Sequence, residues 1–278
     1  MTNLRYPAVA GMFYPGDPEQ LSGQIADYLS HTPQPAARAP KAIIAPHAGY
    51  IYSGPVAASA YATLAPARSR IRRVVLLGPA HRAYVRGVAA SSAAEFATPL
   101  GNIPLVRETI RETTELFPFV HYQDEAHLEE HSLEVQLPFL QQMLDRFELL
   151  PYAVGDARPA EISQLLEALW GGDETLIVIS SDLSHYLDYR SAQRIDRLTS
   201  DAIEQLDADG INQDQACGAI PVRGLLSLAK ARGLVEKTVD LRNSGDTAGP
   251  KDRVVGYGAY LFYEPGAEVT DVERPTAH

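Results

Sequence analysis

Three apolar runs of the sequence end in histidine, and this repetition is the main chemical feature of the chain. AIIAPH ends at His47, VVLLGPAH ends at His81, and LIVISSDLSH ends at His185, three residues after Asp182. In parallel α/β sheets, reacting groups collect just beyond the carboxyl ends of the strands, so three such ends can face one crevice. A single histidine after a strand is more often structural, but the repetition favours a shared site.

A carboxylate that could complete a metal site precedes the last apolar run. The loop LRNSGDTAGP contains Asp246, and an antiparallel last strand would bring this loop to the edge that carries the histidines. Two imidazoles, from His47 and His81, and one carboxylate with open positions form the arrangement typical of non-haem Fe(II) oxygenases. The alternative for Asp246 is a turn aspartate that bonds its own backbone.

His185 and Asp182 are the candidate catalytic pair. An imidazole exchanges protons near neutral pH, so a histidine outside the metal's own ligands can act as an acid or a base. Asp182, three residues earlier, could orient His185 or a substrate.

The segment HLEEHSLEVQLPFL, residues 127–140, holds a second group of candidates. His127 and His131 stand four residues apart, but the His-Glu-x-x-His order of zinc proteases is absent, so such a site is not expected. His131 and Glu134 could reach the crevice as supporting or substrate-binding groups. Equally, they could open an amphipathic helix with a solvated acidic face.

Two further residues could line a pocket. Tyr50 follows His47 in a glycine-containing loop and could contact a flat or phenolic ligand, although loop tyrosines also serve packing. Cys217, in ACGAIPV, could be a soft ligand or a redox thiol, while a lone cysteine is more often a small buried residue.

The elements that would position these residues alternate between strands and helices. Continuous apolar runs predict strands covered on both faces at 42–45, 74–77, 149–154, 176–179 and 254–263. Helical spacing of apolar residues predicts helices at 18–29, 56–64, 133–147, 160–170, 191–206 and 221–232. A hairpin is expected between residues 87 and 105. The pattern predicts an α/β three-layer sandwich with a central mixed, largely parallel sheet flanked by helices.

Composition limits the class of protein. The 278 residues predict one domain over 1–278, with a frayed polar tail from about residue 266. A net charge of −11 argues against nucleic-acid and anionic-membrane binding, which need a positive surface. One cysteine, no apparent signal peptide and no long apolar run predict a cytoplasmic protein without a membrane span.

Six motifs, in order, resemble the Memo family, whose prokaryotic members are also called AmmeMemoRadiSam system protein B. They are APHAGYIYSGPVAASAY, LLGPAH, EHSLEVQLPFL, SSDLSH, CGAIPV and NSGD, and the resemblance extends from AGMFYPGD at 10–17 to VVGYGAY at 254–260. It implies a fold similar to class III extradiol dioxygenases, α/β enzymes that open catechol rings with Fe(II) and oxygen.

The resemblance also implies roles for single residues. His47 and His81 correspond to the two metal-binding histidines and His185 to the acid/base histidine. The third ligand falls in the NSGD loop, where animal Memo proteins have a cysteine and this chain offers Asp246. One mononuclear divalent metal is expected, with Fe(II) preferred and copper or zinc as alternatives.

Several functions follow from the resemblance. The preferred one is an iron-dependent oxidoreductase acting on a small aromatic or phenolic molecule. A metal-dependent hydrolase needs the same ligands. A scaffold protein with a vestigial cleft is the other alternative, and the family name implies AMMECR-type and radical-SAM partners. Animal Memo is also a phosphotyrosine-peptide adaptor, and Tyr14, in GMFYPGD, could border the cleft, but no basic residue lies there to read a phosphate.

Overall fold

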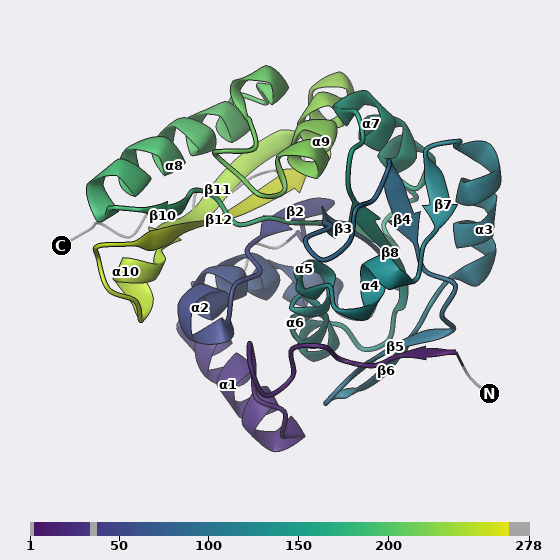
Figure 1. The fold of residues 1–278 in the computed structure, drawn as a ribbon, viewed down its shortest axis with the longest axis horizontal. Helices are drawn as coiled ribbons and strands as arrows, with labels where there is room; N and C mark the ends of the chain where they lie inside the picture. Colours follow the sequence, from purple (N-terminus) through teal and green to yellow (C-terminus); the bar gives the residue numbers. More distant parts are fainter. Residues whose placement is uncertain (1–2, 34–37, 267–278) are drawn as a thin grey trace.

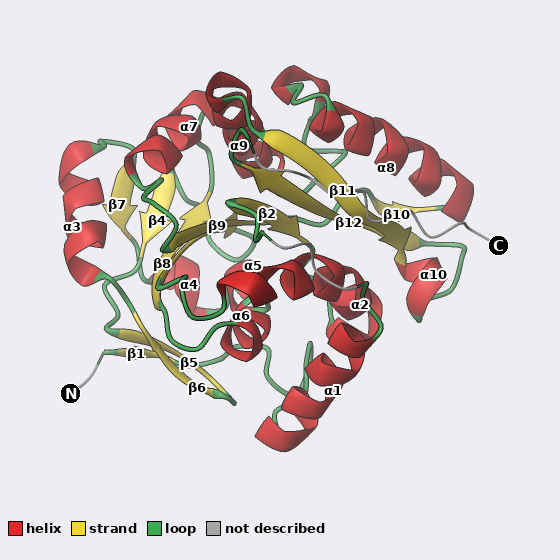
Figure 2. Ribbon diagram, turned by 180° about the vertical axis from the view of Figure 1, so that it is seen from behind, coloured by secondary structure: helices red, strands yellow, loops and turns green. Residues whose placement is uncertain are grey.

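A mixed sheet forms the centre of the protein (Figures 1 and 2). The computed structural model describes residues 3–33 and 38–266, so the predicted tail, apart from Gly266, lies outside the described residues. In sheet order the strands are β10 (His185–Leu187), β12 (Val254–Tyr263), β2 (Ala42–Ala45), β9 (Thr175–Ser180), β3 (Arg73–Pro79), β8 (Glu148–Val154), β4 (Val88–Ala90) and β7 (Val120–Tyr122). A further strand, β11 (Val235–Asn243), pairs with β12.

The middle of the sheet is parallel and buried on both faces. β2, β9, β3 and β8 run in one direction, with Ile44 and Leu77 both in register with Ile179 of β9. Continuous apolar sequence is expected for strands covered on both sides, and these strands bury almost all of their residues. β12 runs antiparallel to β2, pairing Tyr260 with Ile44, so its start lies at the edge where β2 ends.

Helices cover both faces of the sheet, which makes three layers and confirms the predicted sandwich (Figure 1). The helices below the sheet in that view are α1 (Pro18–Ser30), α2 (Tyr50–Tyr61) and α6 (Leu137–Met143). Those above it are α7 (Pro159–Ala168), α8 (Tyr189–Glu204) and α9 (Ala219–Arg232). Helix α3 (Arg107–Leu116) lies beside β7. Among the described helices, none is long and apolar enough to cross a membrane.

A small second sheet carries the N-terminal strand. β1 (Leu4–Arg5) pairs in parallel with β5 (Glu95–Thr98), which forms a hairpin with β6 (Gly101–Pro104). The hairpin expected between residues 87 and 105 is therefore present, while β4, in the same region, joins the main sheet. The N-terminal segment is thereby fixed beside the chain that leads to the short helices α4 (Glu125–Leu128) and α5 (His131–Glu134).

Two helix predictions need correction. The single helix expected over 133–147 is divided into α5 and α6, because Pro138 has no N–H to donate to the carbonyl of Glu134 and its ring crowds that carbonyl. The helix expected from residue 56 begins at Tyr50 instead. Its first N–H, that of Tyr50, has a partner outside the helix, since it donates to the carbonyl of Phe13 at 2.7 Å.

Candidate metal centre

His47 lies just beyond the end of β2 with its ring buried. Its Nδ1 is 2.8 Å from Oγ of Ser180, and that hydroxyl donates its only proton to the carbonyl of Ser132 at 2.6 Å. Ser180 can therefore only accept from His47, so Nδ1 carries the proton and Nε2 has a free lone pair. This tautomer is the one in which Nε2 can bind a metal ion.

His81 follows β3 and is fixed by Glu130. Its Nδ1 is 2.9 Å from Oε1 of Glu130, and its main-chain N–H bonds the other carboxylate oxygen. Burial alone would raise the pKa of Glu130, but the bonds and charge of His81 and the N–H of Ser132 outweigh it and lower the pKa to about 2. The ionised carboxylate only accepts, so Nδ1 of His81 donates and Nε2 is free. A carboxylate behind an imidazole is a common support for metal ligands.

His131 is the first residue of α5 and completes the group. Its ring stacks on that of His81, with centroids 4.8 Å apart and planes at 16°, and lies 5.5 Å from the ring of His47. Its Nδ1 is buried without a hydrogen-bond partner. A buried polar atom without a partner is costly, and a bound cation is one means of satisfying it.

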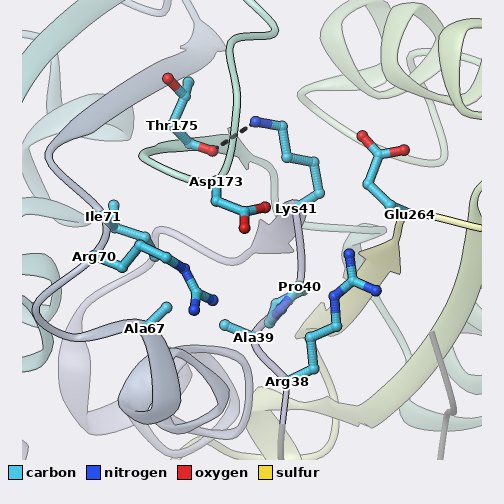
Figure 3. Close-up of a pocket in the computed structure, with 10 residues that line it drawn as sticks. All are labelled: Arg38, Ala39, Pro40, Lys41, Ala67, Arg70, Ile71, Asp173, Thr175 and Glu264. Atoms are coloured by element: carbon cyan, nitrogen blue, oxygen red, sulfur yellow. Dashed lines mark hydrogen bonds between the residues drawn. The ribbon is translucent and has the colours of Figure 1, made fainter.

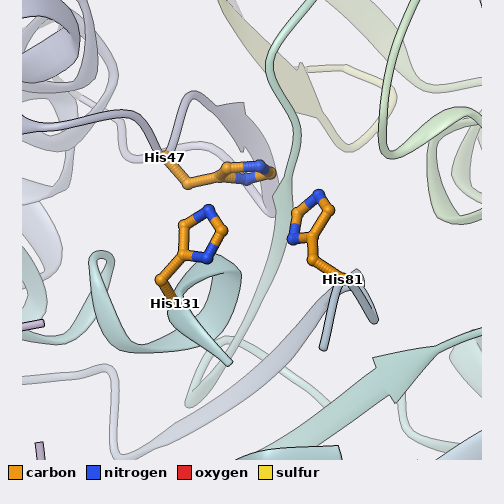
Figure 4. A group of neighbouring side chains, drawn as sticks. All are labelled: His47, His81 and His131. Carbon is orange, nitrogen blue, oxygen red and sulfur yellow. The ribbon is translucent and has the colours of Figure 1, made fainter. Parts of the chain in front are cut away.

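The three imidazoles come together from three different elements (Figure 4). One nitrogen from each ring lies within 4.8 Å of the others. Among the described residues, this is the one group of three or more His, Cys, Asp or Glu side chains that could hold a metal ion. Burial, with neighbouring histidines, lowers the pKa of His47 to about 3 and that of His131 to about 4. Neutral imidazoles are the form that binds metals, so these lowered pKa values favour metal binding by His47 and His131. Together with His81, they could hold a metal ion.

Asp182 and His185 flank this group. Asp182 is buried, and its Oδ1 accepts the main-chain N–H of His47 at 2.7 Å, which fixes the backbone of that ligand. Burial raises the pKa of Asp182, and this effect outweighs the bond from His47 and the charge of His185, which both lower the pKa. His185 begins β10 with a partly buried side chain, and its charge also lowers the pKa of His47. Both predicted catalytic residues thus lie close to the three histidines.

Asp246, the third ligand expected from the sequence, does not lie in the group of three histidines. It lies in the short helix α10 (Ser244–Thr247), where Oδ2 accepts the N–H of Asn243 at 2.9 Å and Oδ1 accepts the hydroxyl of Tyr189 at 2.5 Å. The glycine-containing loop folds into one helical turn, and Asp246 caps it. The arrangement in this structure has three histidines in place of two histidines and one carboxylate.

Three of the expected substrate-binding residues are occupied by protein partners. Tyr50 is buried and donates its hydroxyl to the carbonyl of Val135 at 2.8 Å. Tyr14 is buried and donates to Glu134, whose carboxylate is itself fully buried. These hydrogen bonds tie together the elements around the histidines, and the substrate-binding role of these residues stays a prediction.

Cys217, expected from the sequence as a possible soft ligand or redox thiol, lies beside His47. Its Sγ is 3.3 Å from Nε2 of His47 and also accepts the main-chain N–H of Asp182. Burial raises the pKa of the thiol to about 12, so the side chain is uncharged in this environment.

A separate hollow is drawn in Figure 3. It is lined in part by Lys41, Thr175 and Glu264, near the amino ends of β2 and β9, and Nζ of Lys41 donates to the carbonyls of Gly172 and Thr175 at 2.7 Å. Its volume is about 30 Å³, which is room for roughly two water molecules. The hollow is too small for an aromatic substrate and lies away from the histidines.

Comparison with known proteins gives a family match over most of the chain. The family model described as Memo-like protein matches residues 5–261. The chain belongs to the Memo family. The α/β sandwich described above is the extradiol-dioxygenase-like fold of that family. His47, His81 and His131 lie inside the matched range.

Curated relatives are similar over almost their full lengths. MEMO1 family proteins of Aquifex aeolicus and Saccharolobus solfataricus are each 36% identical to this chain, and one of Sulfolobus acidocaldarius is 35% identical. Each alignment covers 93% of this chain and 99% of the relative. The Memo-family similarity therefore includes both the N-terminal segment and the last strand of the sheet.

Proposed function

We propose that this Memo-family protein is a metal-dependent oxidoreductase of the dioxygenase type that acts on a small aromatic or phenolic molecule. The observation that supports it most directly is the convergence of His47, His81 and His131 within 4.8 Å. The proton-bearing nitrogens of His47 and His81 are bound to Ser180 and Glu130, which leaves their other nitrogens unprotonated and able to bind a cation. The dioxygenase-like fold supports the choice of reaction.

Fe(II) is the metal we propose, with copper and zinc as alternatives, because imidazole ligands suit all three. Bound Fe(II) would supply a redox-active Lewis acid with open coordination positions. His47, His81 and His131 would hold it from three elements of the fold, so its position would be set by the sheet and not by a mobile loop.

The protein's own residues would then manage binding and protons. His185, at the start of β10, would accept a proton at a ring nitrogen from the hydroxyl of a phenolic substrate. Asp182 would keep the backbone of His47 fixed through its bond to the main-chain N–H of that residue. The side chain of His81, 29% exposed, marks the side from which small molecules can reach the histidines.

Metal analysis of anaerobically prepared protein tests the proposal. Protein loaded with Fe(II) should hold about one ion per chain and consume oxygen with catechols, and His131→Ala should lose the ion as His47→Ala does. The proposal fails if anaerobic loading gives no bound iron. It also fails if iron-loaded protein consumes no oxygen with any of a set of catechols.

A metal-dependent hydrolase is the second candidate, and the three-histidine set is the observation that favours it. Three histidines with one open position are the ligands of several catalytic zinc sites, where a bound water becomes the nucleophile. Zinc-loaded protein that hydrolyses esters or amides, with no oxygen consumption by the iron form, would select this function over the first.

A further inference from the structure

A buried carboxylate of α8 holds the backbone just before His185. Helix α8 lies along β10 and β12 (Figure 1), and Asp196 faces these strands with 3% of its surface exposed. Oδ1 of Asp196 accepts the main-chain N–H of Ser184 at 3.0 Å. Burial of a carboxylate is unfavourable unless its contacts compensate, so Asp196 is a candidate for a role beyond packing.

The same carboxylate lies directly on Gly256 of β12. A Cβ at this position would stand 2.1 Å from Oδ2 of Asp196, so a glycine is needed for this close approach. The N–H of Gly256 donates to the carbonyl of Ser184 at 2.8 Å, and its own carbonyl accepts the N–H of Leu183 at 2.8 Å. Ser184 is therefore fixed at its N–H by α8 and at its carbonyl by β12.

His185 follows Ser184 at an irregular point of β10. The register between β10 and β12 shifts between His185 and Leu187, which is a β-bulge or a similar irregularity. Tyr186, between them, has φ of +60°, a left-handed conformation that is uncommon outside glycine. Such irregularities re-aim side chains beside active sites, and strained residues persist where their surroundings impose the conformation. The direction of the His185 ring therefore depends on the contacts that hold this segment.

Two side chains hold the segment, one on each side of His185. After it, the guanidinium of Arg253 lies 5.0 Å from the centroid of the Tyr186 ring. The side chain of Tyr186 is 63% exposed, and a cation–π contact at an exposed site is weak. The bond from Ser184 to Asp196 is buried, where a hydrogen bond is electrostatically stronger. Asp196 is thus the stronger of the two anchors.

The ring of His185 lies within electrostatic reach of both Asp196 and the metal centre. Its charge lowers the pKa of three buried groups, which are His47, Asp182 and Asp196. Coulomb interactions weaken with distance, so the ring lies near all three groups. A displacement of reacting groups by about 1 Å can lower a rate by about 100-fold, so a small movement of this segment would matter for proton transfer.

We propose that Asp196 is a positioning residue for His185, which acts by holding the N–H of Ser184 and so directs the imidazole toward a substrate at the metal centre. This rests on the proposed function, in which His185 accepts the proton of a phenolic hydroxyl. Asp196 itself does not touch the substrate, because its effect passes through the main chain of Ser184.

The first experiment separates turnover from binding in Fe(II)-loaded protein. Metal content, anaerobic catechol affinity and kcat for oxygen consumption are measured for the wild type, Asp196→Ala and Asp196→Asn. Asp196→Ala should keep its metal and its catechol affinity, with kcat lowered about 10- to 100-fold. The side-chain oxygen of Asp196→Asn can still accept the N–H of Ser184, so this variant should recover most of kcat. Asp201→Ala, at a half-buried position of the same helix, is the control and should match the wild type.

The second experiment observes His185 directly in metal-free protein. NMR signals of the His185 ring, assigned by their loss in His185→Gln, should shift in Asp196→Ala and stay near the wild-type positions in Asp196→Asn. Gly256→Ala should give the same shift, because the added methyl group displaces the carboxylate without removing it. This variant also serves if Asp196→Ala does not fold.

A third measurement distinguishes positioning from a structural role. If Asp196 acts through His185, Asp196→Ala should not lower kcat further once His185 has been replaced by glutamine. A structural role alone would lower kcat by the same factor in both backgrounds. Equal factors would therefore overturn the inference.

The remaining outcomes separate this inference from the function on which it rests. Iron-loaded wild type that consumes no oxygen with catechols overturns the proposed function, while the NMR signals of metal-free protein still test the position of His185. Unchanged His185 signals in both Asp196→Ala and Gly256→Ala overturn the inference. It also fails if Asp196→Ala loses its metal, or if Asp196→Asn is as slow as Asp196→Ala.

Discussion

Oε1 of Glu130 lies 2.9 Å from Nδ1 of His81, while the same carboxylate accepts the main-chain N–H groups of His81 and Ser132. One buried side chain thus fixes the ring, the backbone and the tautomer of a candidate ligand. It also holds the start of α5, where the next ligand, His131, stands. The positions of two histidines therefore depend on one carboxylate.

Replacing Glu130 should weaken metal binding without removing a ligand. In Glu130→Gln the side chain offers one acceptor in place of two, so one of these donors loses its partner. We expect metal affinity to fall about 10- to 100-fold, as for other supports of metal-bound histidines. Competition with a chelator of known affinity measures this. The neighbouring Glu129 is exposed, so Glu129→Gln is the matched control; equal affinities in both variants would contradict the role of Glu130.

Asp246 is the residue that distinguishes two possible ligand sets. The sequence predicts two histidines with Asp246, whereas the structure brings together three histidines. Because its carboxylate caps α10, Asp246→Ala should leave metal content unchanged and lower stability by about 0.3–1.5 kcal/mol, the usual range for a helix cap. Element-specific metal analysis and chemical unfolding measure the two effects. Loss of metal from this variant, with His131→Ala still loaded, would restore Asp246 as the third ligand.

Gly78 sets how closely α5 approaches the sheet. A Cβ at this position of β3 would stand 2.8 Å from Oγ of Ser132 and 3.1 Å from Cδ2 of Leu133. Gly78→Ala should therefore displace α5, reduce metal affinity through His131, and cost about 1–3 kcal/mol of stability through overpacking. Calorimetric unfolding and chelator competition measure both.

A glycine with free space provides the control for this substitution. A Cβ at Gly23, inside α1, would meet no atom within 4 Å. Gly23→Ala should raise stability by about 0.5–1 kcal/mol, as expected in a helix interior, and leave metal affinity unchanged. Weaker metal binding in both variants would show that the effect at Gly78 does not come from α5.

The raised pKa of Glu236 predicts a pH dependence of stability that is unrelated to the metal centre. Burial raises the pKa of this carboxyl to about 8. The charge of Glu204 adds to the rise, whereas the hydrogen bond from Thr238 opposes it. The folded state thus binds a proton that the unfolded state releases above about pH 4.5. The stability from this group is complete below that pH and is lost as the pH rises towards 8. Unfolding temperatures measured from pH 5 to 8.5 should fall.

Removing the titrating group should remove this part of the dependence. Glu236→Gln keeps the shape of the side chain without its charge, so its unfolding temperature should fall less over the same pH range and exceed that of the wild type at pH 8.5. Glu112 on α3 is exposed, and Glu112→Gln is the control. Identical pH profiles in all three proteins would show that Glu236 does not titrate in this range.

Much of the fold was predictable because it depends on local patterns. Continuous apolar runs mark strands buried on both faces, and β2, β9, β3 and β8 are such strands. Carboxyl ends of parallel strands share one edge, so His47 and His81 could be placed together from the order of residues alone. The helix expected over 133–147 was wrong in its extent, since a periodic pattern does not show how Pro138 divides it.

The sequence by itself was enough to predict that His47 and His81 follow two strands and meet at one edge of the sheet. Only the tertiary structure decided the third member of the group. His131 follows no strand, and it reaches His47 and His81 because Glu134 fastens its one-turn helix to residues 5–14, more than 100 positions away. Asp246 stands in a loop of suitable composition but is used as a cap. Such long-range contacts depend on packing, which local periodicity does not encode.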